Sequence, residues 1–159
     1  MPQTIIILHN IRSAHNVGSI FRTADAAGAS KIILSGYTPA PIDRFGRERK
    51  ELNKVALGAE KTIEWKQTKQ LSLALKKLKQ EGYTIVAIEQ SQKSTPLFGF
   101  KPKPNQKLAI ILGNEVRGLS PQVLKYADTL LEIPMRGKKE SLNVGVAAGI
   151  VLFGILTTK

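Results

Sequence analysis

Short runs of β-branched and other apolar residues recur along the chain, bounded by Gly, Pro or Ser. Runs of this length between turn residues are typical of buried β-strands. They predict five strands, over residues 4–8, 31–34, 84–88, 108–112 and 130–133.

Helical patterns fill the stretches between these runs. Residues 17–27 are followed by Gly28, and residues 69–80 place Leu71, Leu75 and Leu78 on one helix face. Ser120 precedes a third pattern over residues 121–126 and is a candidate N-cap. A last, wholly apolar helix is predicted over residues 142–156, and a short one over 52–57. Terminal Gly and Ser residues of this kind are common helix stop and start signals.

Strands that alternate with helices predict an α/β fold with a mostly parallel sheet and helices on both faces. In such sheets, ligands bind in the loops beyond the carboxyl ends of the strands. Residues 36–52 form a long basic stretch, and a long loop in a small domain is often functional. The carboxyl edge and this loop are therefore the places where we expect a site.

Length and composition bound the class of protein. A chain of 159 residues with 42% hydrophobic residues is expected to form a single domain, residues 1–159, with no separate RNA-binding domain. It has no cysteine, which excludes disulfides and thiolate chemistry. No secretory signal is recognisable, and the longest apolar stretch is shorter than the roughly 20 residues of a membrane span. We therefore expect a cytoplasmic protein with no membrane partner.

Charge changes this picture most. The net charge is +12 and the isoelectric point is near 10.1, so the surface attracts polyanions through phosphate neutralisation and counterion release. Nucleic acid is the leading class of partner. A basic surface with no partner is the alternative, and charge alone leaves both open.

The residues that form several common kinds of binding site are missing from the sequence. With only two histidines and no clustered carboxylates, the chain predicts no metal site. It contains neither the Gly-x-Gly-x-x-Gly turn of dinucleotide-binding proteins nor a Walker-type loop. A nucleotide-dependent oxidoreductase therefore loses its main support.

Three polar segments follow predicted strands. In the first, residues 10–28, Asn16 is a candidate helix N-cap and Arg22 lies three residues from Asp25, so a plain surface ion pair is the alternative to a functional Arg22. The second, residues 110–120, leaves an apolar strand through Gly113, Asn114 and Glu115, or else is a simple strand exit with solvated charges.

The third segment, residues 131–145, runs from a strand through a basic loop to a helix start. Ser141 and Asn143 lie where free backbone N–H groups favour an anion, although Ser141 is also a candidate N-cap. Gly145 and Gly149, four residues apart, favour close helix packing within the fold or across a dimer interface.

In order and spacing, the three segments resemble the motifs of the SpoU/TrmH family in the SPOUT superfamily. The first resembles its Asn-x5-Arg motif, the second its Leu-Gly-x-Glu-x2-Gly motif, and the third its Ile-Pro-Met-x-Gly and Ser-Leu-Asn-Val motif. The similarity covers most of the chain. It implies an S-adenosylmethionine-dependent RNA ribose 2′-O-methyltransferase.

The resemblance implies more than patterning shows. It implies a C-terminal trefoil knot and a homodimer with active sites at the subunit interface. It also implies that S-adenosylmethionine is bound by seven residues around the second and third motifs: Leu112, Gly113, Asn114, Ile133, Met135, Ser141 and Leu142.

The family's functional positions match five residues, which the resemblance makes the catalytic candidates: Asn16, Arg22, Glu115, Ser141 and Asn143. The central role falls to Arg22. Alignment of the ribose oxygen, the methyl carbon and the sulfur is most of the catalytic task. For Glu115 we expect a role in orienting arginine or backbone groups near the site.

With no added domain expected, the catalytic domain itself must bind RNA. The candidates are basic residues of the first motif, the long loop and the third motif: Arg12, His15, Arg44, Arg47, Arg49, Lys50, Arg136, Lys138 and Lys139. Aromatic residues are scarce, which favours phosphate contacts over base stacking. Transfer RNA is the expected substrate; ribosomal RNA, and a catalytically silent RNA-binding relative, are the alternatives.

Overall fold

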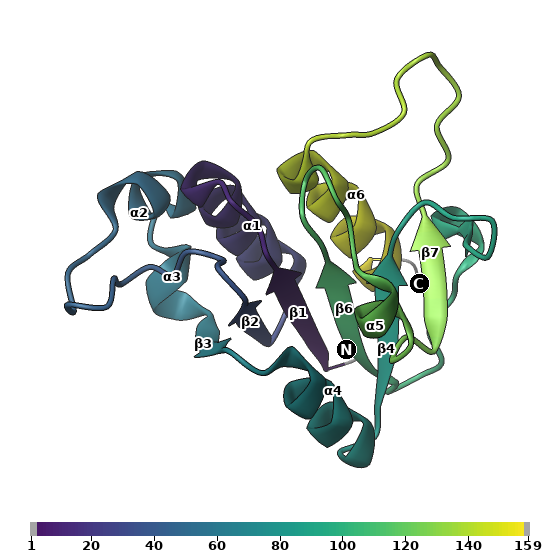
Figure 1. Ribbon diagram of the computed structural model, residues 1–159, viewed down its shortest axis with the longest axis horizontal. Helices are drawn as coiled ribbons and strands as arrows, with labels where there is room; N and C mark the ends of the chain where they lie inside the picture. The colour runs from purple at the N-terminus through teal and green to yellow at the C-terminus, as the bar shows by residue number, and fades with distance from the viewer. Residues whose placement is uncertain (1–2, 158–159) are drawn as a thin grey trace.

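One parallel sheet organises the protein. The computed structural model describes residues 3–157, and within them seven strands pair in the order β3-β2-β1-β6-β4-β7-β5, every pair parallel (Figure 1). The strands are β1 (Thr4–His9), β2 (Lys31–Ser35), β3 (Glu64–Thr68), β4 (Tyr83–Ile88), β5 (Thr95–Pro96), β6 (Lys107–Leu112) and β7 (Thr129–Glu132). All five predicted strands are therefore confirmed within one or two residues.

Helices cover both faces of this sheet, as predicted. On one face lie α1 (Ala14–Ala27), α2 (Lys50–Ala56), α3 (Ala59–Thr62) and α6 (Val144–Leu156), together with the short 3₁₀ helix η1 (Leu97–Gly99). On the other face lie α4 (Leu71–Gln80) and α5 (Pro121–Leu124). The α/β class is thus confirmed. The trefoil knot stays a prediction.

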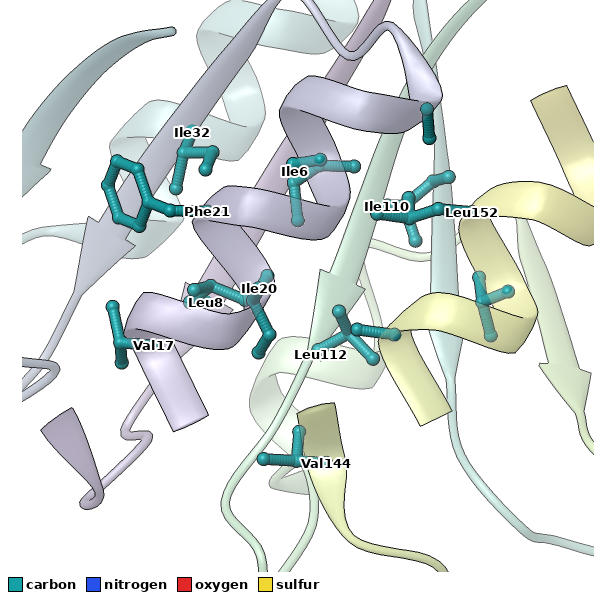
Figure 2. Close-up of a cluster of buried hydrophobic side chains, with 14 of the residues drawn as sticks. Ile6, Leu8, Val17, Ile20, Phe21, Ile32, Ile110, Leu112, Val144 and Leu152 are labelled. Atoms are coloured by element: carbon teal, nitrogen blue, oxygen red, sulfur yellow. The ribbon is translucent and has the colours of Figure 1, made fainter. Parts of the chain in front are cut away.

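Strand alternation divides the core into two layers. In β1, Ile6 and Leu8 belong to the layer under α1 and α6, whereas Ile5 and Ile7 belong to the layer under α4. Figure 2 shows the first layer, in which Phe21 of α1 and Leu152 of α6 pack with side chains from the strands. Both faces of the central strands are apolar because both are covered by helices.

The two strands that the sequence did not predict lie at the sheet edges. β3 pairs only with β2, and its residues Glu64–Thr68 are mostly exposed and polar. β5 has two residues, Thr95–Pro96, and pairs only with β7. Short, polar or proline-containing edge strands protect a sheet from further pairing, and they carry no apolar alternation for a sequence to show.

The start of α1 corrects one prediction. The helix begins three residues earlier than expected, and its N-cap is Ser13, whose hydroxyl accepts a hydrogen bond from Asn16 N at 3.1 Å. Asn16 is therefore not the cap. Its side chain is left available for a contact with another element. At the other end, Gly28 closes the helix with a left-handed φ of 81°, as expected.

The start of α6 corrects a second prediction. Its N-cap is Asn143 and not Ser141, because Asn143 Oδ1 accepts hydrogen bonds from Gly145 N at 2.8 Å and Val146 N at 3.3 Å. The helix begins at Val144, two residues later than predicted. Gly145 and Gly149 face Ser19 and Thr23 of α1, so the predicted close packing occurs between two helices of the same chain.

Candidate functional site

A pocket of about 390 Å³ lies beyond the carboxyl ends of β4, β6 and β7. All seven residues assigned to cofactor binding line it: Leu112, Gly113, Asn114, Ile133, Met135, Ser141 and Leu142. Glu115, a catalytic candidate, lines it as well. The structure thus brings the second and third motifs together at the edge of the sheet where parallel α/β folds bind ligands.

Sequence reasoning missed the wall that β4 contributes. Ile88, Glu89 and Gln90 line the pocket, as does Glu132 at the end of β7. Glu89 and Gln90 are polar residues directly after an apolar strand, a signal that was visible in the sequence. Their place in this site depends on the strand order, because β4 lies between β6 and β7.

Glu89 also shapes the loop after β6. Its carboxylate accepts a hydrogen bond from Leu119 N at 2.7 Å and lies against Gly118, where a Cβ atom would come within 2.4 Å of Oε2. Gly118 has a φ of 64°. Glycine adopts this conformation without strain and leaves room for the carboxylate.

Glu115 connects this pocket to the first motif. Its Oε1 atom lies 3.2 Å from Arg12 N and 3.5 Å from Ser13 N, both of which donate hydrogen bonds to the carboxylate. Hydrogen bonds to a carboxylate are stronger than bonds between neutral groups. Glu115 therefore holds the backbone at the entrance to α1, in agreement with the orienting role expected for it.

The first and third motifs meet directly. Asn143 Nδ2 donates a hydrogen bond to Asn16 Oδ1 at 3.1 Å, across 127 positions of sequence. The same side chain of Asn143 caps α6 through its oxygen. The two asparagine amides are thus fixed near the pocket, and their catalytic roles stay predictions.

Arg22 lies apart from the pocket, on the exposed surface of α1. The alternative, a surface ion pair between Arg22 and Asp25, is not found among residues 3–157; Asp25 Oδ1 accepts a hydrogen bond from Thr62 of α3 at 2.9 Å. None of the ion pairs within residues 3–157 involves Arg22. Its guanidinium is therefore available to a ligand that approaches from outside.

The RNA-binding candidates fall into three groups, and all of them are exposed except Arg49, which is half-buried. Arg12 and His15 lie at the start of α1, and Arg136, Lys138 and Lys139 lie in the loop between β7 and α6. Arg44, Arg47, Arg49 and Lys50 lie in the segment before α2 and at its first residue. Arg49 differs from the rest because its Nε atom donates to Ala40 O at 2.9 Å, which gives it a structural role in this segment.

The segment before α2 is an ordered hairpin rather than an open loop. Arg49 N donates to Pro41 O, and Asp43 Oδ1 accepts hydrogen bonds from Phe45 N at 2.8 Å and Arg47 N at 3.0 Å. Chiefly the bond from the Arg47 backbone lowers the pKa of Asp43 below its usual value. We call residues 41–49 the basic hairpin.

An aromatic ring stands at the tip of the basic hairpin. Phe45 is 66% exposed, with Arg44 and Arg47 placed 4.7 Å and 4.9 Å from its centroid. A cation and the aromatic face that it covers attract each other. The hairpin thus presents two guanidinium groups in one place, of which that of Arg47 is paired with Asp43 at 3.1 Å.

Residues 3–157 contain no group of three or more His, Cys, Asp or Glu side chains placed to hold a metal ion. None of the helices in that range is long and apolar enough to cross a membrane.

Fold and site together define an α/β protein with a single parallel sheet and a ligand pocket at its carboxyl edge, built from the second and third motifs and hydrogen-bonded to the first. Residues 3–153 match the SpoU rRNA Methylase family. The chain therefore belongs to the SpoU rRNA Methylase family, which confirms the resemblance seen in its motifs.

Curated relatives are longer than this chain. An uncharacterized tRNA/rRNA methyltransferase of Mycoplasma pneumoniae, the MG252 homolog, is 34% identical over 95% of this chain and 60% of its own length. The 23S rRNA (guanosine-2′-O-)-methyltransferase RlmB of Neisseria meningitidis is 34% identical over 95% of this chain and 57% of its own. The chain thus spans somewhat more than half of the length of these relatives.

Solved structures share the fold. An AdoMet-bound rRNA methyltransferase from Sinorhizobium meliloti matches with a TM-score of 0.85 and 31% identity, over 96% of this chain and 55% of that one. The TrmH/SpoU tRNA modifying enzyme of A. aeolicus matches with a TM-score of 0.82 and 27% identity, over 97% of this chain and 74% of that one.

Proposed function

We propose that this protein transfers a methyl group from S-adenosylmethionine to a ribose 2′-hydroxyl in RNA. The observation that carries the proposal is the convergence of three motifs: Glu115 ties the pocket to the start of α1, and Asn143 ties α6 to Asn16. Family membership and the 2′-O-methyltransferase relatives support the same reaction.

The residues around the pocket suit S-adenosylmethionine. Four carboxylates line it, those of Glu89, Glu115, Glu132 and Glu140, and its lining residues include no Lys or Arg. This charge complements a ligand with a sulfonium and an ammonium group, and it disfavours the phosphates of a dinucleotide. Leu112, Ile133 and Leu142 offer apolar contacts for an adenine ring.

The cofactor, when bound, supplies a methyl group on a positively charged sulfur. The chain's own contribution is alignment and electrostatics. The amides of Asn16 and Asn143 are fixed against each other, and they can hydrogen-bond a ribose near the pocket. A guanidinium group is a hydrogen-bond donor and has no acceptor site for a proton, so we assign Arg22 to binding a phosphate or stabilising developing charge, and not to proton removal.

For the substrate we propose ribosomal RNA, because relatives from several bacteria are named as enzymes that act on 23S rRNA. This differs from the transfer RNA expected from the motifs alone. Transfer RNA stays the second candidate, supported by the likeness to the A. aeolicus tRNA modifying enzyme. A cytoplasmic location is part of the proposal, since both RNAs are found there.

We further propose a homodimer in which α6 contributes to the interface. The helix Val144–Leu156 contains no charged or hydrogen-bonding side chain, yet Val146 is 54% and Phe153 44% exposed. An apolar stripe on one face of a helix that is already buried on the other marks a surface for association. Symmetric pairing of the same face in two copies would cover it.

The experiment that tests the reaction is transfer of radiolabelled methyl from S-adenosylmethionine to purified rRNA and tRNA from cells that lack this gene. Nucleoside analysis should find label in a 2′-O-methylnucleoside of one RNA class. We expect Arg22→Ala to lower transfer at least about a hundredfold, the scale of losing one charge-stabilising group. Its affinity for S-adenosylmethionine should be unchanged, because Arg22 does not line the pocket.

Arg22→Lys is the matched control, since it keeps the charge and loses the forked geometry of the guanidinium. Cofactor binding by the wild type without transfer to either RNA would favour a silent RNA-binding relative. Full activity of Arg22→Ala would remove Arg22 from the catalytic set.

A further inference from the structure

A second pocket adjoins the first on the side of β1 and β2. It has a volume of about 490 Å³ and is lined by Arg12, Tyr37, Asn114, Val116 and Arg117. Asn114 and Val116 also line the first pocket, so the two share a wall. A volume of this size accommodates a small organic ligand such as a nucleotide.

Asn114 holds the shared wall in place with both atoms of its amide. Its Nδ2 donates hydrogen bonds to Asn10 O and to the Tyr37 hydroxyl, each at 2.9 Å. Its Oδ1 accepts from Val116 N at 2.9 Å and Arg117 N at 2.8 Å. One side chain therefore fixes the loops after β1, β2 and β6 relative to one another.

A hydrogen bond to the backbone of Tyr37 also holds this residue in place. Tyr37 N donates to Asn10 Oδ1 at 3.2 Å, and the preceding Gly36 has a φ of 63°. A Cβ atom at Gly36 would come within 1.7 Å of Asn10 Oδ1, so a larger residue would displace the Asn10 side chain and would be strained at this φ. The residue Tyr37 is 58% exposed even though its hydroxyl and its backbone N–H both form hydrogen bonds. It is a preorganised aromatic surface.

The charge of the second pocket is opposite to that of the first. Arg12 and Arg117 are exposed, and neither takes part in the ion pairs found within residues 3–157. Glu115, the nearby carboxylate, is bonded to backbone N–H groups of Arg12 and Ser13. The pocket thus combines two available guanidinium groups with an aromatic face, while four carboxylates lie in the first pocket.

We propose that this second pocket binds one nucleotide of the RNA substrate, with its base stacked on Tyr37 and its phosphate bound by Arg12 and Arg117. Aromatic faces bind unpaired bases, and arginine forks bind phosphate oxygens. The inference rests on the proposed function and deepens it: the substrate segment beside the cofactor pocket is single-stranded. Arg117 and Tyr37 join Arg12 as RNA-binding residues, and Asn114 is a positioning residue for both pockets.

The test measures binding of a fluorescently labelled single-stranded RNA of about ten nucleotides and mixed sequence, by anisotropy over a range of KCl concentrations. Tyr37→Leu should weaken binding about fivefold or more, because loss of one base stack has effects of this size. Tyr37→Phe keeps the ring and should stay within about twofold of the wild type. Circular dichroism checks that each variant is folded.

Arg117→Gln should weaken binding and reduce the slope of log affinity against log salt by about 0.7, the value for one phosphate contact of a single strand. Lys103→Gln is its control, since it removes one exposed charge from the loop that precedes the amino end of β6. Arg117→Gln should bind S-adenosylmethionine like the wild type, because Arg117 does not line the first pocket.

Two failures are distinguishable. If the wild type binds RNA and S-adenosylmethionine, and Tyr37→Leu and Arg117→Gln match its RNA affinity and salt slope, the second pocket is not a nucleotide site and the proposed function stands. If the wild type binds neither ligand, both proposals are overturned. Equal losses in Tyr37→Phe and Tyr37→Leu would also overturn stacking, since they would trace the effect to the hydroxyl.

Discussion

Among single residues, two asparagines join segments that are distant in the sequence through hydrogen bonds of their side-chain amides. Asn114 and Asn143 each accept backbone hydrogen bonds through Oδ1 and donate to another loop or helix through Nδ2. A carboxylate accepts but cannot donate, so aspartate at either position would lose one half of the contacts. Asn114 and Asn143 thus depend on having a hydrogen-bond donor and an acceptor in the same side chain.

His9, at the end of β1, belongs to the same network and carries a pH dependence. Asn10 Nδ2 donates to His9 Nε2 at 3.3 Å, and His9 Nδ1 lies 2.8 Å from Ser35 Oγ. Burial lowers the pKa of His9 below its usual 6.5. The folded protein therefore binds this proton less readily than the unfolded chain does.

The expected outcome is a loss of stability in acid. The contribution of neutral His9 is fully present above pH 6.5, the unfolded value, and falls as the pH drops through the lower folded pKa. Urea unfolding at pH 7.5 and pH 5 should show a smaller loss for His9→Gln than for the wild type. His15→Gln, at the exposed histidine, should behave like the wild type. Identical losses in all three proteins would contradict the role of His9.

At the scale of elements, the packing of α1 against α6 depends on small residues. A Cβ atom at Gly145 would lie 3.1 Å from Asn143 Oδ1 and 3.4 Å from Ser19 Oγ, whereas one at Gly149 would lie 3.8 Å from Thr23 Cγ2. The first position is tight and the second has ordinary contact distance. The two glycines therefore differ in what they tolerate.

Gly145→Leu should destabilise the protein by about 1–3 kcal/mol, because a large side chain forces the helices apart. Gly149→Ala should be neutral or stabilising by up to about 1 kcal/mol, since alanine favours a helix interior. Chemical denaturation followed by circular dichroism measures both. A stable Gly145→Leu protein with the activity of the wild type would show that α1 and α6 can separate at no cost.

The basic hairpin gives a second prediction at this scale. Arg49 supports the hairpin through Ala40, so the residues to test are Arg44 and Arg47, which flank Phe45. Replacing both with Gln should reduce the slope of log RNA affinity against log salt by roughly one to two units. Filter binding of rRNA and tRNA between 50 and 300 mM KCl measures it. An unchanged slope would place the hairpin outside the RNA interface.

At the scale of the whole molecule, the apolar stripe on α6 predicts how two copies associate. Phe153→Asp places a charge in the proposed interface and should convert the dimer to a monomer at micromolar concentration, as sedimentation equilibrium would show. Leu73→Asp is the control, because Leu73 is 55% exposed on α4, on the other face of the sheet. A dimer that survives Phe153→Asp would locate the interface elsewhere.

The class of fold and the segments that form the site could be predicted from the amino-acid sequence alone. Buried parallel strands and amphipathic helices leave periodic apolar patterns, and capping residues such as Ser120 and Gly28 act within a few positions of the chain. The three motifs were recognisable for the same reason. Each is a continuous stretch at the end of a strand or the start of a helix.

Which residues these segments contact depends on how the whole chain folds in three dimensions. The strand order places Glu89 beside the loop after β6, and the hydrogen bond between Asn16 and Asn143 spans 127 positions of sequence. The edge strands, the N-caps Ser13 and Asn143, and the hydrogen bond between Tyr37 and Asn114 could likewise not be predicted from the pattern. Such contacts depend on long crossover connections and on side-chain directions in three dimensions, which local periodicity does not encode.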